Sequence, residues 1–116
     1  MTSYSDATGL YPVKRRARHA EREGFRISEI ALDAGQNVPW HYHTNIADTF
    51  YVLNGVIAIA LRGPEEQIQL ERGETYTVVP GREHEVTVAE GADAAFLIMQ
   101  GFGQYDFVPT ESGTRD

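Results

Sequence analysis

The sequence contains no cysteine among its 116 residues. This absence excludes disulfide bonds, thiolate zinc sites and cysteine nucleophiles, so any metal ion must be bound by histidine and carboxylate side chains. Long hydrophobic runs are also missing, because no segment reaches the roughly 20 consecutive apolar residues that span a bilayer. Residues 1–13 lack the basic and apolar regions of a secretion signal. We therefore expect a cytoplasmic protein without a membrane partner.

Basic residues are scarce: ten Lys and Arg stand against 17 Asp and Glu, which gives a formal net charge of -7. Such a surface repels phosphate backbones, so nucleic acid is not an expected partner. The few basic residues cluster, and six of them lie within residues 14–26. We interpret the segment 14–22 as a solvated arm, or as an arm that docks on an acidic neighbouring subunit, rather than as an anion-binding patch.

Helical periodicity is nearly absent, and only residues 13–23 could form a helix. From residue 25 onward, short apolar runs alternate with turn-forming Gly, Pro and Asn, which is typical of β-strands, and Asn54-Gly55 is the sharpest hairpin signal. The strands that we predict are 25–32, 49–53, 56–61, 67–70, 75–79, 84–88 and 94–99. The pattern indicates an all-β sandwich or barrel, divided into an N-terminal basic arm (1–24), a β-barrel (25–109) and a short flexible tail (110–116).

Three of the four histidines form a pattern typical of a metal site. His41 and His43 are separated by one residue, and alternate side chains of a strand point to the same face, so both can point into a barrel. His84 is the natural third donor, and Asp48 could supply a carboxylate. Three imidazoles that converge at about 2.0 to 2.2 Å bind a divalent cation and leave positions open for a ligand. A buried histidine pair on its own is more often structural.

The same alternation predicts which neighbours line a pocket. In the strand that follows the histidine pair, Asp48, Phe50 and Val52 share one face, so we expect Phe50 and Val52 to line the substrate pocket. In the last predicted strand, either Phe96, Ile98 and Gln100 or the opposite face could line the cavity. Other large side chains we assign to core or dimer packing, namely Trp40, Tyr76, Phe96, Met99 and Tyr105.

Two spaced motifs surround these histidines. The pattern G-x5-H-x-H-x4-E-x6-G is matched by Gly35, His41, His43 and Gly55, with Asp48 in place of Glu. The pattern G-x5-P-x-G-x2-H-x3-N is matched by Gly73, Gly81 and His84, with Val79 in place of Pro and Val88 in place of Asn. With both motifs, the sequence resembles the cupin family over most of residues 25–108.

The resemblance implies a small jelly-roll barrel of about six to eight strands, often a homodimer. It also implies one divalent transition metal ion, either Fe, Mn, Zn or Ni, bound by residues that align with His41, His43, Asp48 and His84. Aspartate is one methylene shorter than glutamate, which leaves two roles open for Asp48. Either it ligates the metal, or the histidines and water hold the metal while Asp48 accepts hydrogen bonds or acts as a base through water.

The function expected from this resemblance is that of a small mononuclear metal enzyme acting on a small oxygen-rich metabolite. Oxygenase, isomerase and lyase chemistry are all compatible with a metal that polarises the substrate, and Asp48 is the candidate catalytic residue. The alternative is a non-catalytic cupin that binds or senses a small ligand, with a structural metal or none. The fold alone does not choose between these classes.

Overall fold

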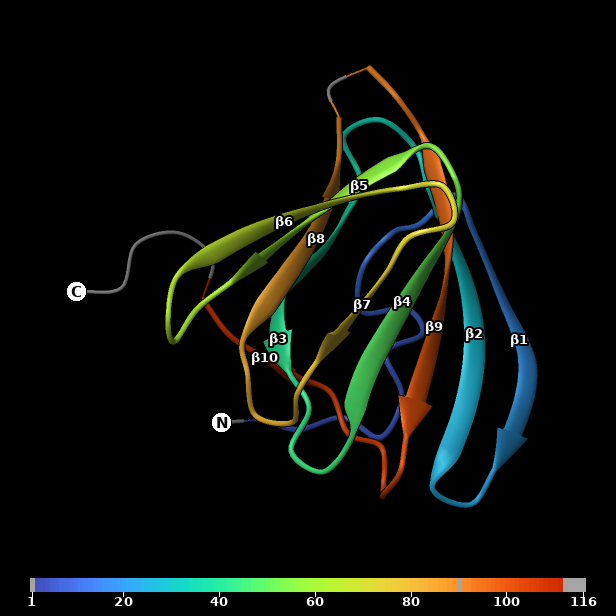
Figure 1. Ribbon diagram of the computed structural model, residues 1–116. Coiled ribbons are helices and arrows are strands. Elements are labelled where there is room, and N and C mark those ends of the chain that lie inside the picture. The colour runs from blue at the N-terminus through green and yellow to red at the C-terminus, as the bar shows by residue number, and fades with distance from the viewer. Residues whose placement is uncertain (1, 90, 112–116) are drawn as a thin grey trace.

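The computed structural model describes residues 2–89 and 91–111, which form two five-stranded antiparallel sheets that face each other (Figure 1). In spatial order, the first sheet is formed by β1 (Arg15–Arg22), β2 (Phe25–Leu32), β9 (Ala94–Gly101), β4 (Ala47–Asn54) and β7 (Thr75–Val78). The second sheet is formed by β10 (Val108–Pro109), β3 (Asn37–Tyr42), β8 (His84–Val88), β5 (Val56–Leu61) and β6 (Glu66–Glu71). The described residues contain no helix long and apolar enough to span a membrane.

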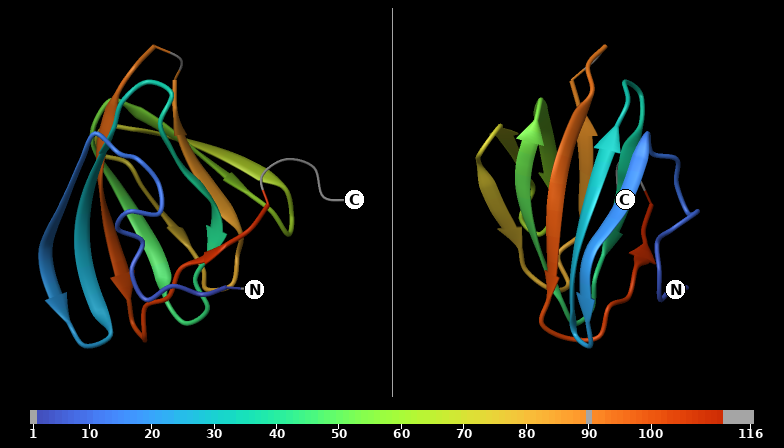
Figure 2. Two further views of the ribbon diagram at one scale, coloured as in Figure 1. Left: turned by 180° about the vertical axis from the view of Figure 1, so that it is seen from behind. Right: turned by 90° about the vertical axis from the view of Figure 1, so that its right-hand side faces the viewer.

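The chain passes from one sheet to the other at most connections, which defines a jelly roll (Figure 2). From β2 to β5 each successive strand lies in the opposite sheet, and the same holds from β6 to β10. The all-β jelly-roll prediction is therefore confirmed. The hydrogen-bonded ladders of the described strands stay within each sheet, so the barrel is a pair of facing sheets rather than one closed ladder.

All seven predicted strands are present, but the helix considered for residues 13–23 is wrong. β1 occupies this segment and pairs with β2 along its whole length, with a bulge between Arg18 and Ala20. A single-sided apolar stripe is missing there, so a helix would have no face to bury, whereas a strand gains a ladder of backbone hydrogen bonds. The second half of the predicted arm is therefore part of the barrel wall.

A turn forms at Asn54-Gly55 as predicted, but the hairpin is wrong, because β4 and β5 lie in opposite sheets and do not pair with each other. Gly55 has a φ of 78°, a conformation that side chains with a Cβ rarely adopt. A Cβ at this position would also lie 2.5 Å from the carbonyl oxygen of Asp93. Only glycine fits, and the turn fixes where β4 ends and so where its inward-facing side chains lie.

The core fills one end of the space between the sheets. Neighbouring strands of the first sheet contribute Ile30, Phe96 and Val52, which lie in one row across β2, β9 and β4. The second sheet contributes fully buried residues from β5 and β8, namely Ile57, Ile59, Leu61 and Val86. A second row across the same three strands lies four residues away along each strand and is polar. It consists of Arg26 on β2, Gln100 on β9 and Asp48 on β4.

Candidate metal centre

The structure brings His41, His43, Asp48 and His84 together at the polar end of the interior. His41 lies on β3, His43 directly after it, Asp48 on β4 and His84 on β8, so both sheets contribute. All four side chains are buried, with at most 3% of each residue exposed. One possible ligand atom from each residue lies within 4.8 Å of the others, which is the size of a metal coordination sphere.

Strand geometry explains this convergence. His41 and His84 are register partners in neighbouring strands, and their ring centroids are 4.3 Å apart. His43 lies two residues after His41 and turns to the same side, with a centroid distance of 4.8 Å. On β4 the expected alternation is confirmed, because Asp48 and Phe50 are buried while Tyr51 is 40% exposed.

Each histidine is held by a backbone carbonyl, which fixes its tautomer. Nδ1 of His41 lies 2.7 Å from the carbonyl oxygen of Pro39, and Nδ1 of His84 lies 2.9 Å from the carbonyl oxygen of Arg82. In His43 the partner is the carbonyl oxygen of Asp106. A carbonyl oxygen can only accept, so each Nδ1 carries the proton. In a neutral ring the lone pair is then on Nε2, the atom that points into the cluster.

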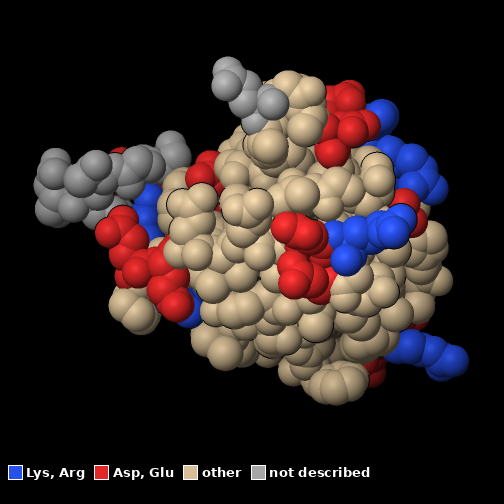
Figure 3. Space-filling model, turned by 45° about the horizontal axis from the view of Figure 1, so that its top comes forward, with Lys and Arg blue, Asp and Glu red and all other residues tan. Residues whose placement is uncertain are grey.

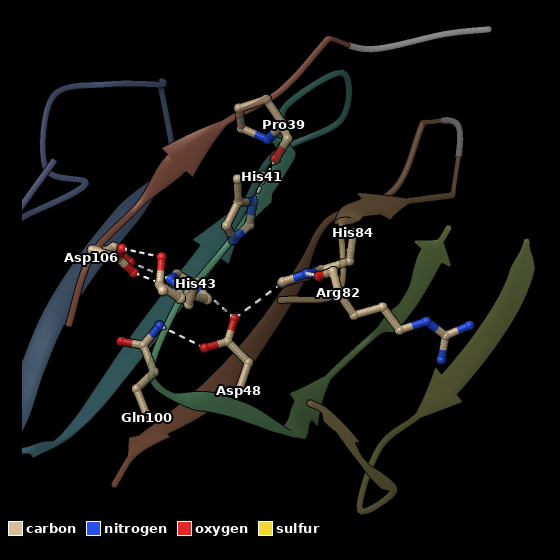
Figure 4. A network of polar contacts seen from close by, with 9 residues as sticks. Pro39, His41, His43, Asp48, Arg82, His84, Gln100 and Asp106 are labelled. Carbon is tan, nitrogen blue, oxygen red and sulfur yellow. Dashed lines mark hydrogen bonds and ion pairs between the residues drawn. The ribbon is translucent and has the colours of Figure 1, made fainter. Parts of the chain in front are cut away.

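The carboxylate of Asp48 points at two of these Nε2 atoms (Figure 4). Its Oδ2 lies 2.9 Å from Nε2 of His43 and 3.1 Å from Nε2 of His84. Its Oδ1 accepts a hydrogen bond of 2.9 Å from Nε2 of Gln100. Two acceptors in contact repel unless a proton or a cation lies between them, and atoms bound side by side to one divalent ion lie about 3.0 Å apart. The donor set and its spacing therefore fit a divalent metal.

The electrostatics of the cluster keep two of the four donors, Asp48 and His41, in the form that binds a metal. Burial alone would raise the pKa of Asp48, but the charges and hydrogen bonds of His43 and His84 outweigh it and hold this pKa well below its usual range. Burial, together with the neighbouring histidines, holds the pKa of His41 well below its usual value, so His41 is neutral. Burial also opposes a charge on His43, but the adjacent Asp48 overrides it and raises the pKa.

A pocket opens beside the cluster, and residues of both sheets line it. Phe50 lines this pocket, together with Ile98 and Gln100, so the inward face of β9 is the one with Phe96, Ile98 and Gln100. Val52 lies one row deeper, in the apolar core. The histidine side of the pocket is covered by Phe107, whose ring stacks on His41 with centroids 4.3 Å apart.

Several pocket residues were not predicted. Tyr105, which we had assigned to packing, lines the pocket with its ring centroid 5.3 Å from that of His43. The basic segment contributes Arg16 and Arg18, and β2 contributes Arg26. One signal could have found Arg26, since it is in phase with the inward-facing Ile30 on β2. No periodicity marks Tyr105, because it lies in a segment without regular structure.

The fold and this centre define a jelly-roll domain with a buried candidate metal site. A model of the cupin domain matches residues 28–100, and the chain belongs to the cupin family. No curated protein matches the chain significantly.

Solved structures share the fold. An uncharacterized conserved protein with a double-stranded β-helix domain from Klebsiella pneumoniae has a TM-score of 0.73 and 20% identity, with 84% of each chain covered. A cupin-2 domain containing protein from Shewanella frigidimarina has a TM-score of 0.64 and 23% identity, covering 81% of this chain and 87% of that one. An oxalate oxidase has a TM-score of 0.68 and 15% identity, covering 75% of this chain and 46% of its own.

Proposed function

We propose that the chain is a small mononuclear metal enzyme that acts on a small oxygen-rich metabolite. One divalent transition metal ion would be held by His41, His43, Asp48 and His84. The observation that carries the proposal is the contact of Oδ2 of Asp48 with two histidine Nε2 atoms, 2.9 and 3.1 Å away, whose rings already donate through Nδ1. These contacts need a metal ion or a proton between the two atoms to be favourable, and three histidines with one carboxylate bind first-row ions such as Fe, Mn, Zn and Ni.

Of the two roles open to Asp48, the geometry favours metal ligation. The Asp48 side chain is shorter than that of glutamate, but it still reaches the Nε2 atoms of two histidines. It does so because β4 places Asp48 directly opposite Gln100 of β9. Gln100 holds Oδ1 at 2.9 Å and so directs Oδ2 toward the cluster. The role as a base acting through water remains the alternative, and the two are separated by the metal content of an Asp48 variant.

The remaining residues of the pocket would bind and orient a ligand. When bound, a divalent ion supplies a Lewis acid that polarises a ligand oxygen. Burial, reinforced by the charge of Asp48, raises the pKa of Tyr105, so its hydroxyl keeps its proton and can donate to a ligand. Phe107 and Phe50 cover His41 and His84 and exclude water from that side.

A second candidate function is non-catalytic ligand binding without a metal. It is favoured by one observation: protons on Nε2 of His43 and His84 would also satisfy both contacts with Asp48. In that form the cluster is a buried polar network that positions a ligand rather than an ion. The homodimer and the cytoplasmic location stay predictions.

Metal analysis of the purified protein separates these functions. We expect about one first-row metal ion per chain by mass spectrometry, and loss of that ion when His41 and His84 are both changed to Gln. His19→Gln is the matched control, because His19 lies on β1 and contacts Glu29 on the exposed face. Metal retained by the folded double variant, or absent from protein grown with each of the four metals, would contradict the proposed enzyme.

A further inference from the structure

We propose that Arg16 binds a carboxylate group of the ligand, so that the ligand is a small organic anion held between the metal centre and the β1 wall of the pocket. This inference rests on the function proposed above and narrows its ligand class. It starts from the three arginines that line the same pocket as His41, His43 and Asp48.

Strand register explains why these arginines face inward. On β1, Arg16 pairs with Ile30 and Arg18 with Ser28, and both partners are buried residues of β2. Arg26 pairs with Gln100, the residue that holds Asp48. The guanidinium groups therefore lie along the inner face of the sheet that also carries Asp48, on β4.

Two of the three arginines already have partners. Arg18 donates to the Ser28 hydroxyl and to Glu21, each at 2.9 Å. Arg26 lies 3.9 Å above the ring centroid of Tyr105 and reaches Glu21 at 3.5 Å. These contacts hold both side chains in the wall, and neither side chain has a buried nitrogen without a hydrogen-bond partner among the described residues.

Arg16 differs from its two neighbours. Its Nη2 atom is buried and has no hydrogen-bond partner among the described residues. Its guanidinium carbon lies 5.0 Å from the ring centroid of Tyr11, a cation–π contact, and the Tyr11 hydroxyl also interacts with the guanidinium, but Nη2 itself has no acceptor among the described residues. A buried guanidinium N–H without an acceptor lowers the stability of a protein, and such unpaired groups are rare in folded proteins. An oxygen of a bound ligand is the missing acceptor.

The charges that face the pocket favour an anion. Its lining has three arginines against two carboxylates, Asp6 and Asp48. Asp6 is engaged by the backbone N–H and hydroxyl of Thr8, each at 2.8 Å, and Asp48 belongs to the metal cluster. A divalent ion would add two further positive charges. The planar guanidinium fork matches the two oxygens of a carboxylate, which makes a carboxylate the favoured anion.

The outer face of the same segment does not compete for this role. Arg15 pairs with Glu29 at 2.7 Å, and Lys14 with Asp93 at 3.1 Å. β1 lies on the right of Figure 1. On the same side of Figure 3, Lys and Arg side chains (blue) lie against Asp and Glu side chains (red). The exposed Lys14 and Arg15 are thus paired with acidic neighbours, whereas no ion pair is formed by the inward-facing Arg16 among the described residues.

Calorimetric titration of zinc-loaded protein tests the proposal. The probes are malonate, succinate and glutarate, each compared with its half-amide, which keeps the shape and one carboxylate but lacks the second charge. We expect the best-fitting diacid to bind about ten- to a hundredfold more tightly than its half-amide, the range of a charge-assisted hydrogen bond. Arg16→Gln should reduce this preference to less than about twofold, because the remaining carboxylate still reaches the metal.

The matched control is Arg15→Gln, the same change one residue earlier on the opposite face, which should keep the full preference. Should Arg16→Gln not fold, Arg16→Lys keeps the charge but lacks the fork and should lose most of the preference. A preference that persists in the folded Arg16 variant overturns the inference, as does equal binding of diacids and half-amides, or tighter binding of inorganic phosphate. Metal content, measured in parallel, reports on the proposed function: protein that takes up none of Fe, Mn, Zn and Ni refutes that function and the inference together, whereas full zinc without a preference refutes the inference alone.

Discussion

The interior between the two sheets has an apolar end and a polar end, and the same three strands build both. On β2, β9 and β4, the row Ile30, Phe96 and Val52 packs in the core, while the row four residues away contains Arg26, Gln100 and Asp48. Four residues of a strand span about 13 Å. Stability and chemistry are thus separated along each strand rather than assigned to different strands.

The two ends differ in what holds them together. Burial of apolar surface stabilises the core without directional requirements, at about 25 cal/mol per Å². Each buried polar group of the other end needs a partner, and Asp48 has three in His43, His84 and Gln100. A change at the apolar end should therefore affect unfolding, and a change at the polar end should affect the metal. Three predictions test this division.

The largest effect is expected from Phe96→Ala at the apolar end. Phe96 is fully buried, and its removal leaves a cavity among Ile30, Val52 and Phe50. We expect a loss of about 3 to 5 kcal/mol in the free energy of unfolding, measured by urea denaturation. Metal content per folded chain should stay unchanged. A large loss of metal from the folded variant would contradict the claim that the apolar end affects stability and not metal binding.

Asp48→Asn should have the next largest effect, on metal affinity. If Asp48 ligates the ion, the change weakens binding by at least about ten- to a hundredfold, measured by competition with a chelator. The neutral amide keeps the shape of the side chain but loses the charge that attracts the cation. Unchanged metal content would assign Asp48 to the base role and overturn ligation.

The smallest of the three effects is expected from Gln100→Leu, which removes the donor to Oδ1 of Asp48 but keeps a side chain of similar size. We expect metal affinity to fall by about tenfold, because the carboxylate loses the group that orients it. Gln69→Leu on the exposed face of β6 is the control. Equal affinities in both variants would show that Asp48 is oriented by the histidines alone.

Much of the fold and of the metal cluster could be predicted because both depend on local regularities. The alternation of β4 placed Asp48 and Phe50 on the inner face, and the spacing of His41 and His43 required only a strand. β1 was missed because its strand conformation comes from pairing with β2 and not from its own apolar pattern. The contact of His43 with the carbonyl of Asp106, 63 residues away, depends on where the last segment crosses the barrel, which no local pattern encodes.

β1 is an edge strand, hydrogen-bonded to β2 alone among the strands of its sheet. None of the four residues of the metal cluster lies on it. A substitution on β1 can therefore reshape the part of the pocket wall that Arg16 and Arg18 form, without changing any of the four residues that could hold a metal.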